Sequence, residues 1–573
     1  MSSTSSRPDG RTEPPEVLAV RSATRDLRLH LDSLPIEYSL AVPAEQFLAG
    51  TAFMLARQRY AGAESMIGSG FGGTVIGTLA RSLFGEGLRW LWIGDAPERR
   101  RNILGDLIEE RHRICTTFEE TDVSAPNLAR WLMPIPNVAD LAGQSHTWID
   151  AEPIPAEEDL LRDFLTDQLG TLHHARARAL LDMAGLQGAV MILTHSGHGN
   201  YLGLQSSLTA DGAPAHDLRH DHEALFMQVA AAGVVSTLLG SATAVPEVWP
   251  AEVARDLFLD QAVRLAEAVC DAAARVHGLD RTRKAPAQVG KPRKGRARTV
   301  ILRPLAAVID DEVLLPEGNS ADGVIAAAEA YYETVRSMAF DPWKGNSSSL
   351  NHVLMFSGGA SLMETVLATY ERPGSEVIAV CAARMLLEES ARVAWRYAVS
   401  AGEFEARAKQ YFDEFRARRK KTIETLTGSG VPRATAERLL AAPDNVRRGT
   451  SLEQTAKNRQ RLPTTGSMLR DLGEPFPEPG WLEVAYTLLS QITHNTPVGA
   501  LHMLSYQPVW GTGISSEMLA LTLDTACLSS AQLIGRGAML LTDQSDEAKE
   551  YQDLLLRAAG VVHNAARPVH WLD

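Results

Sequence analysis

The sequence has few cysteines, few aromatic residues and no long, strongly apolar run. Its four cysteines are spread over 573 residues without a Cys-x-x-Cys pair, which argues against a zinc knuckle and against a disulfide framework. Aromatic residues make up 6% of the chain, whereas alanine and leucine dominate its periodic stretches and favour helix. We therefore expect an all-α protein in a reducing, cytoplasmic compartment.

No segment has the pattern of a signal peptide or a membrane anchor. Residues 1–18 are polar and rich in proline, so we expect a disordered tail there. The weakly polar run Val229–Val245 is shorter than the roughly 20 apolar residues of a spanning helix, and we interpret it as a buried helix. The net charge of −14 argues against a protein that coats nucleic acid with its whole surface.

Apolar residues recur every three to four positions in two long regions, which is the helical period. In the first region they do so in Glu45–Arg59, Thr74–Ile93, Arg99–Phe118, Glu157–Met183, Glu223–Thr243 and Ala251–His277. In the second they do so in Ala326–Ala339, Ser375–Val399, Phe404–Leu426, Ala434–Leu440, Trp481–Thr493, Ser515–Leu541 and Ser545–His563. These patterns predict two helical bundles, over residues 19–278 and 326–573.

Residues 279–325 separate the two predicted bundles. The stretch Arg281–Arg298 holds eight basic residues among Pro and Gly and no acidic one, so it cannot form a core. It serves either as a solvated tether or as an electrostatic contact for RNA or DNA. The β-branched runs Thr299–Val308 and Glu312–Leu315 that follow predict a short β-hairpin.

The two bundles share a sequence motif. Ala80–Trp92 aligns without gaps on Ala383–Trp395, with six of thirteen columns identical. The pairs that matter are Arg81/Arg384, Glu86/Glu389, Arg89/Arg392 and Trp92/Trp395, each 303 residues apart (384 − 81). Further on, Thr194-His195 matches Thr493-His494. We therefore expect one duplicated helical fold, arranged about a pseudo-twofold axis.

The Arg-x4-Glu-x2-Arg-x2-Trp motif places its four side chains on one broad face of a helix. One hypothesis makes Arg81, Arg89, Arg384 and Arg392 into clamps for phosphate or carboxylate, oriented by Glu86 and Glu389. The alternative is structural, with ion pairs on the helix and the tryptophan in the core.

Each repeated histidine comes after an apolar run and before a helix breaker. His195 precedes Ser196-Gly197, and His494 precedes Asn495-Thr496-Pro497, which predicts a helix C-terminus at both places. A protonated ring is favoured there, so both histidines are candidate general acids or bases. Capping of the last carbonyls is the structural alternative.

No metal or cofactor is predicted. The spacings of His198, His216, His220 and His222 allow metal ligation, but these histidines lie among Gly, Asp and Pro in a stretch without counterpart in the second bundle. We interpret them as solvated loop residues.

On its Arg-x4-Glu-x2-Arg helix and its threonine–histidine element, each half resembles bacterial helical domains of unknown function and is loosely similar to HEPN-type bundles. The resemblance implies paired bundles with Arg and His converging across an interface. It leads to the hypothesis of a nucleic-acid- or nucleotide-associated, defence-type ribonuclease, in which the four arginines bind phosphate and His195 and His494 act as acid or base. The alternatives are a non-catalytic scaffold or regulatory binding protein, and a small-molecule enzyme with a pocket in a bundle core. Homo-oligomerisation stays open.

Overall fold

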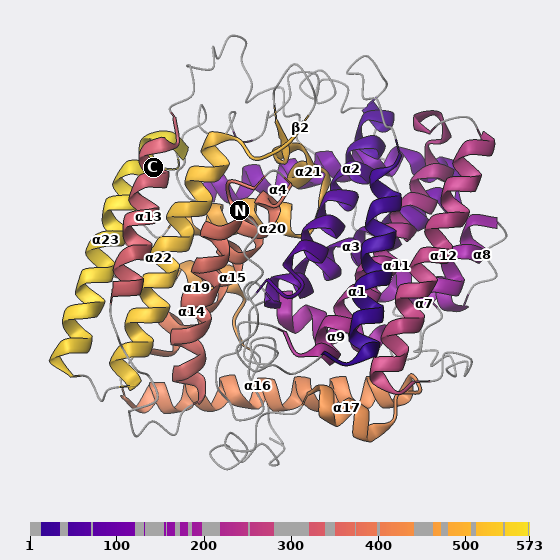
Figure 1. Ribbon diagram of the computed structural model, residues 1–573. Coiled ribbons are helices and arrows are strands. Elements are labelled where there is room, and N and C mark those ends of the chain that lie inside the picture. The colour runs from indigo at the N-terminus through magenta and orange to yellow at the C-terminus, as the bar shows by residue number, and fades with distance from the viewer. Residues whose placement is uncertain are drawn as a thin grey trace, which may run out of the picture.

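The computed structural model describes residues 13–34, 44–69, 73–120, 131, 154–155, 157–166, 172–181, 186–197, 218–249, 252–279, 320–337, 350–372, 374–397, 401–440, 462–470, 480–505, 511–541, 545–570 and 572. These residues form an all-α fold, as predicted (Figure 1). We refer to residues up to His277 as the first half and to those from Asp322 as the second half.

The helices of the first half are α1 (Pro15–Asp32), α2 (Ala44–Met66), α3 (Gly73–Asp95), the 3-10 helix η1 (Pro97–Arg101), α4 (Asn102–Glu120), α7 (Glu157–Thr166), α8 (Leu172–Leu181), α9 (Leu186–Gly197), α11 (His220–Ala244), the 3-10 helix η4 (Pro246–Val248) and α12 (Glu252–His277). Those of the second half are α13 (Asp322–Ser337), α14 (Leu350–Thr369), α15 (Glu376–Tyr397), α16 (Ala401–Gly428), α17 (Arg433–Leu439), α19 (Thr465–Arg470), α20 (Gly480–Thr493), α21 (Pro497–His502), α22 (Ser516–Leu541) and α23 (Asp546–His570).

A long apolar helix forms the centre of each half. Among the described residues, α11 and α22 alone are long and apolar enough to cross a bilayer by length and composition, and 94% and 89% of their apolar windows are buried by other helices. The interpretation of Val229–Val245 as part of a buried helix is thus confirmed. In the first half, α11 packs so closely on α3 that a Cβ added at Gly240 would lie 2.3 Å from the backbone carbon of Trp90. Any larger residue at position 240 would clash with α3, so the close packing of the two helices requires glycine there.

The helices of the two halves pack in the same order. In the first half α11 contacts α2, α3 and α12, and in the second half α22 contacts α14, α15 and α23. Likewise α1 lies on α12 as α13 lies on α23, and α9 covers α3 as α20 covers α15. This recurrence is what an internal duplication predicts. The two motif helices, α3 and α15, also contact each other between the halves.

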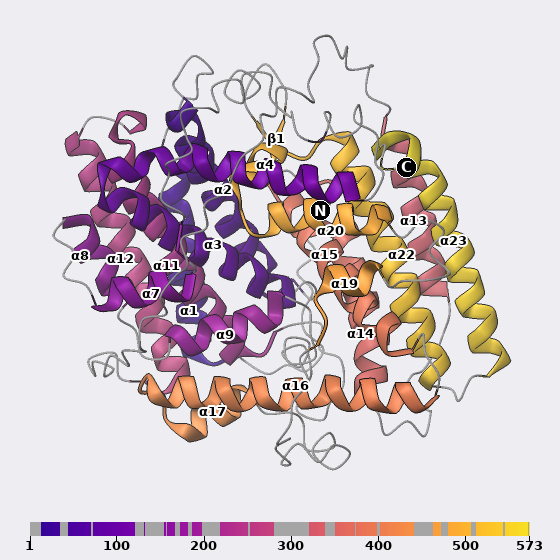
Figure 2. The same cartoon turned by 180° about the vertical axis from the view of Figure 1, so that it is seen from behind.

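Each half extends a helix onto the other half. The first arm, α4, leaves α3 and packs against α20 and α21, as Figure 2 shows from behind. The second arm, α16 with α17, leaves α15 and packs against α9 along the lower edge of the molecule in Figure 1. The halves are therefore interlocked by two reciprocal arms.

Some expectations fail or fall outside the described residues. Helix α1 begins at Pro15, so the end of the expected tail is helical, and α14 was not predicted at all. The basic stretch Arg281–Arg298 and the hairpin expected in 299–315 lie outside the described residues. Within the described part of the chain, the only strands are β1 (Leu504–Ser505) and β2 (Gly511–Thr512), which pair antiparallel elsewhere.

Candidate functional site

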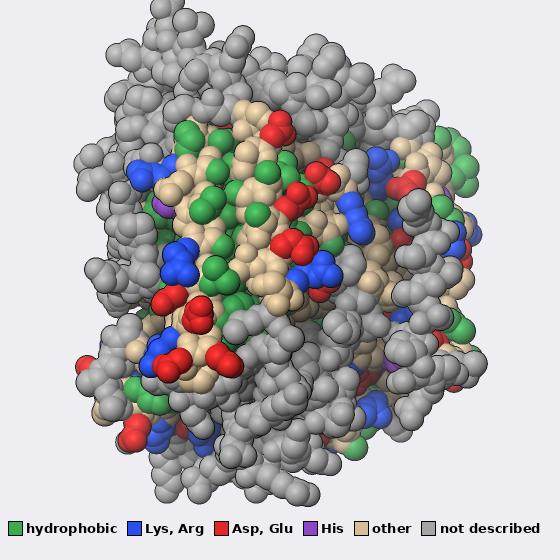
Figure 3. All heavy atoms as spheres, turned by 60° about the vertical axis from the view of Figure 1, so that its left-hand side comes forward, with side chains coloured by type: hydrophobic (Ala, Val, Ile, Leu, Met, Phe, Trp, Pro, Cys, Tyr) green, Lys and Arg blue, Asp and Glu red, His purple; other side chains and the backbone are tan. Residues whose placement is uncertain are grey.

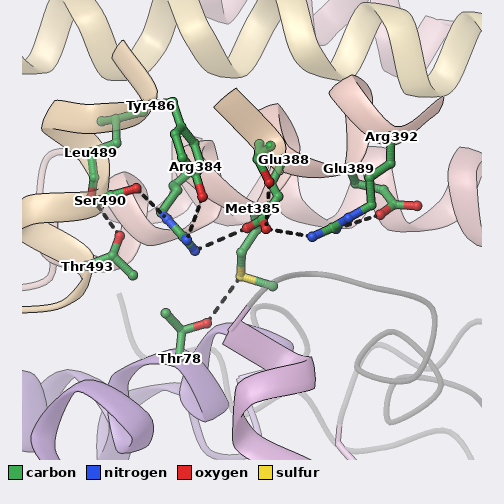
Figure 4. A network of polar contacts seen from close by, with 11 residues as sticks. Thr78, Arg384, Met385, Glu388, Glu389, Arg392, Tyr486, Leu489, Ser490 and Thr493 are labelled. Atoms are coloured by element: carbon green, nitrogen blue, oxygen red, sulfur yellow. Dashed lines mark hydrogen bonds and ion pairs between the residues drawn. The ribbon is translucent and has the colours of Figure 1, made fainter. Parts of the chain in front are cut away.

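The repeated motif of the second half lies on α15 and forms a buried polar network (Figure 4). Arg384 is only 1% exposed. Its Nη1 lies 3.3 Å from Glu388 Oε2, its Nε donates to Ser490 Oγ at 3.0 Å, and its Nη2 donates to Tyr486 Oη at 3.4 Å. The last two groups belong to α20, so Arg384 joins α15 to the helix that covers it.

Arg392, about two turns further along α15 than Arg384, binds two carboxylates. Its Nη2 donates to Glu388 Oε1 at 2.5 Å and its Nη1 donates to Glu389 Oε2 at 3.0 Å. Glu389 also accepts a hydrogen bond from Tyr411 Oη at 3.1 Å, and Tyr411 belongs to the second arm. The Arg392–Glu389 pair thus fixes the point at which the arm leaves the bundle.

In the first half, Arg81 on α3 finds its partners on other helices. It forms an ion pair with Glu157 of α7, and its Nε donates to Thr194 Oγ1 of α9 at 3.1 Å. The position equivalent to Glu388 is Gly85 (388 − 303), and a Cβ there would lie 3.1 Å from Glu157 Oε2. Glu157 therefore occupies the space that a side chain at position 85 would need.

Arg89 and Glu86 connect α3 to the first arm. Arg89 Nη2 lies 2.5 Å from Asp106 Oδ2 of α4, and its Nη1 lies 3.6 Å from Glu86 Oε2. Glu86, 5% exposed, also accepts a hydrogen bond of 2.6 Å from the indole N–H of Trp90. Burial raises the pKa of Glu86, while Arg89 and Trp90 act in the opposite direction.

In both halves the motif tryptophan contacts an arginine at the point where the arm begins. Arg99 in η1 lies over the Trp92 ring at 4.5 Å from its centroid and donates to the Trp92 carbonyl oxygen at 3.2 Å. Arg407 in α16 lies over the Trp395 ring at 5.1 Å and donates to the Trp395 carbonyl oxygen. Each pair covers the end of a motif helix with a cation, which the helix dipole favours.

The middle of the first arm carries a carboxyl group with an unusual pKa. Glu110 Oε2 accepts a hydrogen bond from the backbone N–H of Val498, at the start of α21, at 3.2 Å. Burial raises the pKa of Glu110 to about 8, and the neighbouring carboxylate of Asp106 acts in the same direction. The fold therefore favours the protonated form of the Glu110 carboxyl group at neutral pH.

The repeated histidines lie at or next to the C-terminal ends of α9 and α20, the helices that cover the two motif helices. His195 lies in the last turn of α9, and its side chain is outside the described residues. His494 is exposed, directly after α20, and its backbone N–H donates to the carbonyl oxygen of Ser490. Both histidines lie at the predicted helix ends.

Of the four loop histidines, His220 and His222 belong to the first turn of α11, which corrects their interpretation as loop residues. His222 is 3% exposed. His198 and His216 lie outside the described residues. Where the structure describes the chain, no group of three or more His, Cys, Asp or Glu side chains could hold a metal ion.

A second repeat was overlooked in the sequence. Val269–Asp280 aligns on Val562–Asp573 with seven of twelve columns identical, and it pairs His277 with His570, 293 residues apart (570 − 277). Both histidines are buried at the C-terminal ends of α12 and α23.

The surroundings of these two histidines differ. His570 Nε2 and His563 Nδ1 lie 3.1 and 2.9 Å from the same Asp524 oxygen, and Trp481 stacks on both rings. At His277, by contrast, neither ring nitrogen has a hydrogen-bond partner among the described residues.

Each half also receives a contact from the opposite half close to its buried histidine. Trp131, which follows the first arm in the sequence, donates its indole N–H to the carbonyl oxygen of His570 at 3.0 Å. In the first half, the carbonyl oxygens of Arg438 and Leu439, the last residues of the second arm, accept hydrogen bonds from Arg219 and His222 at the start of α11.

Comparison of the chain with protein-family models, with curated proteins and with solved structures finds no match.

Proposed function

We propose that the chain is a non-catalytic scaffold or regulatory binding protein, in which the repeated motif holds two exchanged arms in place. The observation that carries this proposal is the burial of the motif side chains of the second half in ion pairs with the chain's own carboxylates. Arg384 and Arg392 are 1% and 8% exposed, and Glu388 pairs with both.

An anion clamp would need different geometry. A phosphate group is bound by arginine N–H donors that face an open cleft. Here a phosphate would have to displace Glu388 or Glu389 from inside the bundle, and it would leave a buried carboxylate without its cation. Such an exchange costs several kcal/mol. The face formed by α13 and α23 in Figure 3 mixes acidic, basic and hydrophobic side chains, and no basic surface gathers on it.

The nucleic-acid- or nucleotide-associated ribonuclease stays a prediction, with RNA or DNA reached through Arg281–Arg298. Arg81 and His195 do not have the compact Arg-x4–6-His spacing of HEPN ribonucleases, but Arg25–His30 and Arg557–His563 do. At the second pair the histidine is held by Asp524. A cytoplasmic location and the small-molecule enzyme also stay predictions.

The experiment compares activity with stability in three forms of the full chain: the wild type, Glu388→Gln, and the double variant His195→Gln/His494→Gln. The scaffold proposal expects no hydrolysis of RNA, DNA or nucleotides by the wild type above a protein-free blank. It also expects a lower melting temperature for Glu388→Gln only. Hydrolysis by the wild type that the double histidine variant abolishes, with an unchanged melting temperature, would overturn the proposal in favour of the ribonuclease.

A further inference from the structure

The tip of the second arm docks on His222 of the first half, and the buried His277 lies near both His222 and Arg438 of that arm. His222 lies 2.8 Å through Nε2 from the carbonyl oxygen of Leu439, so Nε2 carries the hydrogen, because a carbonyl only accepts. Its Nδ1 is buried without a hydrogen-bond partner among the described residues, as are both ring nitrogens of His277. Both rings are 3% exposed. The contact therefore fits imidazole rings in their neutral form.

The charged groups around the two rings act on them in opposite directions. From α11 and its N-cap, the groups that act on the rings are Asp221 and Arg219, and from α17 the group is Arg438. Glu223, also on α11, is held by Arg21 of α1 at 2.7 Å. Asp221 favours a charged ring and the two arginines oppose it, but a proton added to either ring would create a buried N–H donor without an acceptor among the described residues.

We propose that the second arm is a pH-dependent latch: neutral His222 and His277 keep α17 docked on the first half, and acidification releases it while the root of the arm stays on α15. The root is held by Tyr411 and Arg407, whose contacts to Glu389 and Trp395 do not involve histidine. Release would expose the ends of α11 and α12 and solvate both rings. This inference does not depend on the proposed function.

The direction of the pH effect follows from linkage. Burial lowers the pKa of His222 and lowers that of His277 to about 4. An undocked, solvated histidine titrates near its usual pKa of about 6.5. The undocked state therefore binds more protons between about pH 6.5 and pH 4. Docking is at full strength above this window and weakens as the pH falls through it.

We expect no such latch at the corresponding place in the second half. There, the equivalent His570 gives its Nε2 hydrogen to Asp524, its Nδ1 accepts the backbone N–H of Leu572, and Trp131 of the first half contacts its backbone carbonyl oxygen and not its ring. Acid is therefore expected to loosen the tip of one arm only.

The test measures hydrogen–deuterium exchange of the full chain at pH 7.5, 6.0 and 5.0, corrected for the intrinsic exchange rate at each pH. We expect peptides from α17 and the end of α16 to exchange at least tenfold faster at pH 5.0 than at pH 7.5. Peptides from α15 and α22 are expected to keep their protection. The same α17 protection at all three pH values, or loss of protection in all helices together, would overturn the latch.

Two variants tie the effect to the histidine site. His277→Leu replaces one of the two rings with an apolar side chain that cannot be protonated, so α17 is expected to open at a lower pH than in the wild type. Should this variant not fold, Arg438→Gln removes one nearby positive charge and is expected to move the opening to lower pH. The exposed His494→Gln serves as the matched control and should open as the wild type does. Acid opening that neither variant alters would contradict the proposal.

Discussion

The repeated arginine of the motif pairs with a glutamate in both halves, but that glutamate comes from a different helix in each. In the second half Arg384 pairs with Glu388 one turn away on its own helix, whereas in the first half Arg81 pairs with Glu157 of a separate helix. Gly85 stands where Glu388 would be, and its missing side chain leaves room for Glu157. The repeated arginine thus keeps an ion pair in both halves, but the glutamate that completes the pair comes from a different position in the chain.

The two ion pairs also differ in their exposure to solvent. The side chains of Arg384 and Glu388 are 1% and 3% exposed, and those of Arg81 and Glu157 are 26% and 22% exposed. Buried pairs are sensitive to the loss of one partner, whereas solvent-exposed pairs contribute little. We therefore expect the second half to depend much more strongly on its network than the first.

The largest effect is expected from Glu388→Gln. This change removes the buried carboxylate with which both Arg384 and Arg392 form ion pairs. Removing one partner of a buried ion pair costs about 3–5 kcal/mol, so the free energy of unfolding should fall by that amount in urea denaturation. A change below about 1 kcal/mol would show that the network does not hold the second half together.

The packing of α3 on α11 gives the next largest effect. In Gly240→Ala the new Cβ would meet the backbone of Trp90, so we expect a loss of about 1–3 kcal/mol in the free energy of unfolding. Gly560→Ala is the matched control, because nothing lies within 4 Å of a Cβ at that position of α23. It should be neutral or stabilise by up to about 1 kcal/mol. Equal effects of the two changes would contradict the close approach.

The pH response of the first arm is expected to oppose that of the second. The pKa of Glu110 lies near 8 in the folded chain and near 4.5 in an unfolded one, so the folded state holds a proton that unfolding releases between these values. The free energy of unfolding should fall as the pH rises through this window, by at most about 1.4 kcal/mol per pH unit.

Glu110→Gln should remove this dependence and become more stable than the wild type above pH 8. Urea denaturation at pH 6, 7.5 and 9 measures it, with the partly exposed Glu109→Gln as control. A variant whose difference from the wild type does not change with pH would show that the Glu110 carboxyl is not protonated in the fold.

The smallest effect is expected from Glu157→Gln, the counterpart of the first variant. Its ion pair with Arg81 is about a quarter exposed, so we expect a loss of no more than about 1 kcal/mol in the same urea experiment. A loss as large as that of Glu388→Gln would remove the contrast between the halves.

Periodicity predicted most of the helices, because their apolar faces are regular. It overlooked α14, whose central Gly358-Gly359 looks like a break, and α1, which is short of apolar residues and leaves Leu18 and Leu29 about half exposed. The tertiary packing of these helices on α22 and α12 is what makes them helical, and no local pattern contains that information.

The motif predicted which residues form the networks but not what they contact. A helical face shows that Glu86 and Arg89 are neighbours, but their partner Asp106 belongs to the next helix, and Glu389 is joined to Tyr411 in the same way. The pair His277/His570 could have been found from the sequence, since the repeated Val-His-x-Leu-Asp at the end of both bundles is visible there.

The exchange of arms has a consequence for synthesis on the ribosome. Glu110 and its partner Val498 are 388 residues apart, so the first arm emerges long before its docking surface exists. Until then the nascent first half must keep α4 without its partner helices, and the apolar side chains that α4 later buries are available to other proteins. Translation of the final helices is thus the step that closes the molecule, and a chain stopped before α20 would lack the surface that secures the first arm.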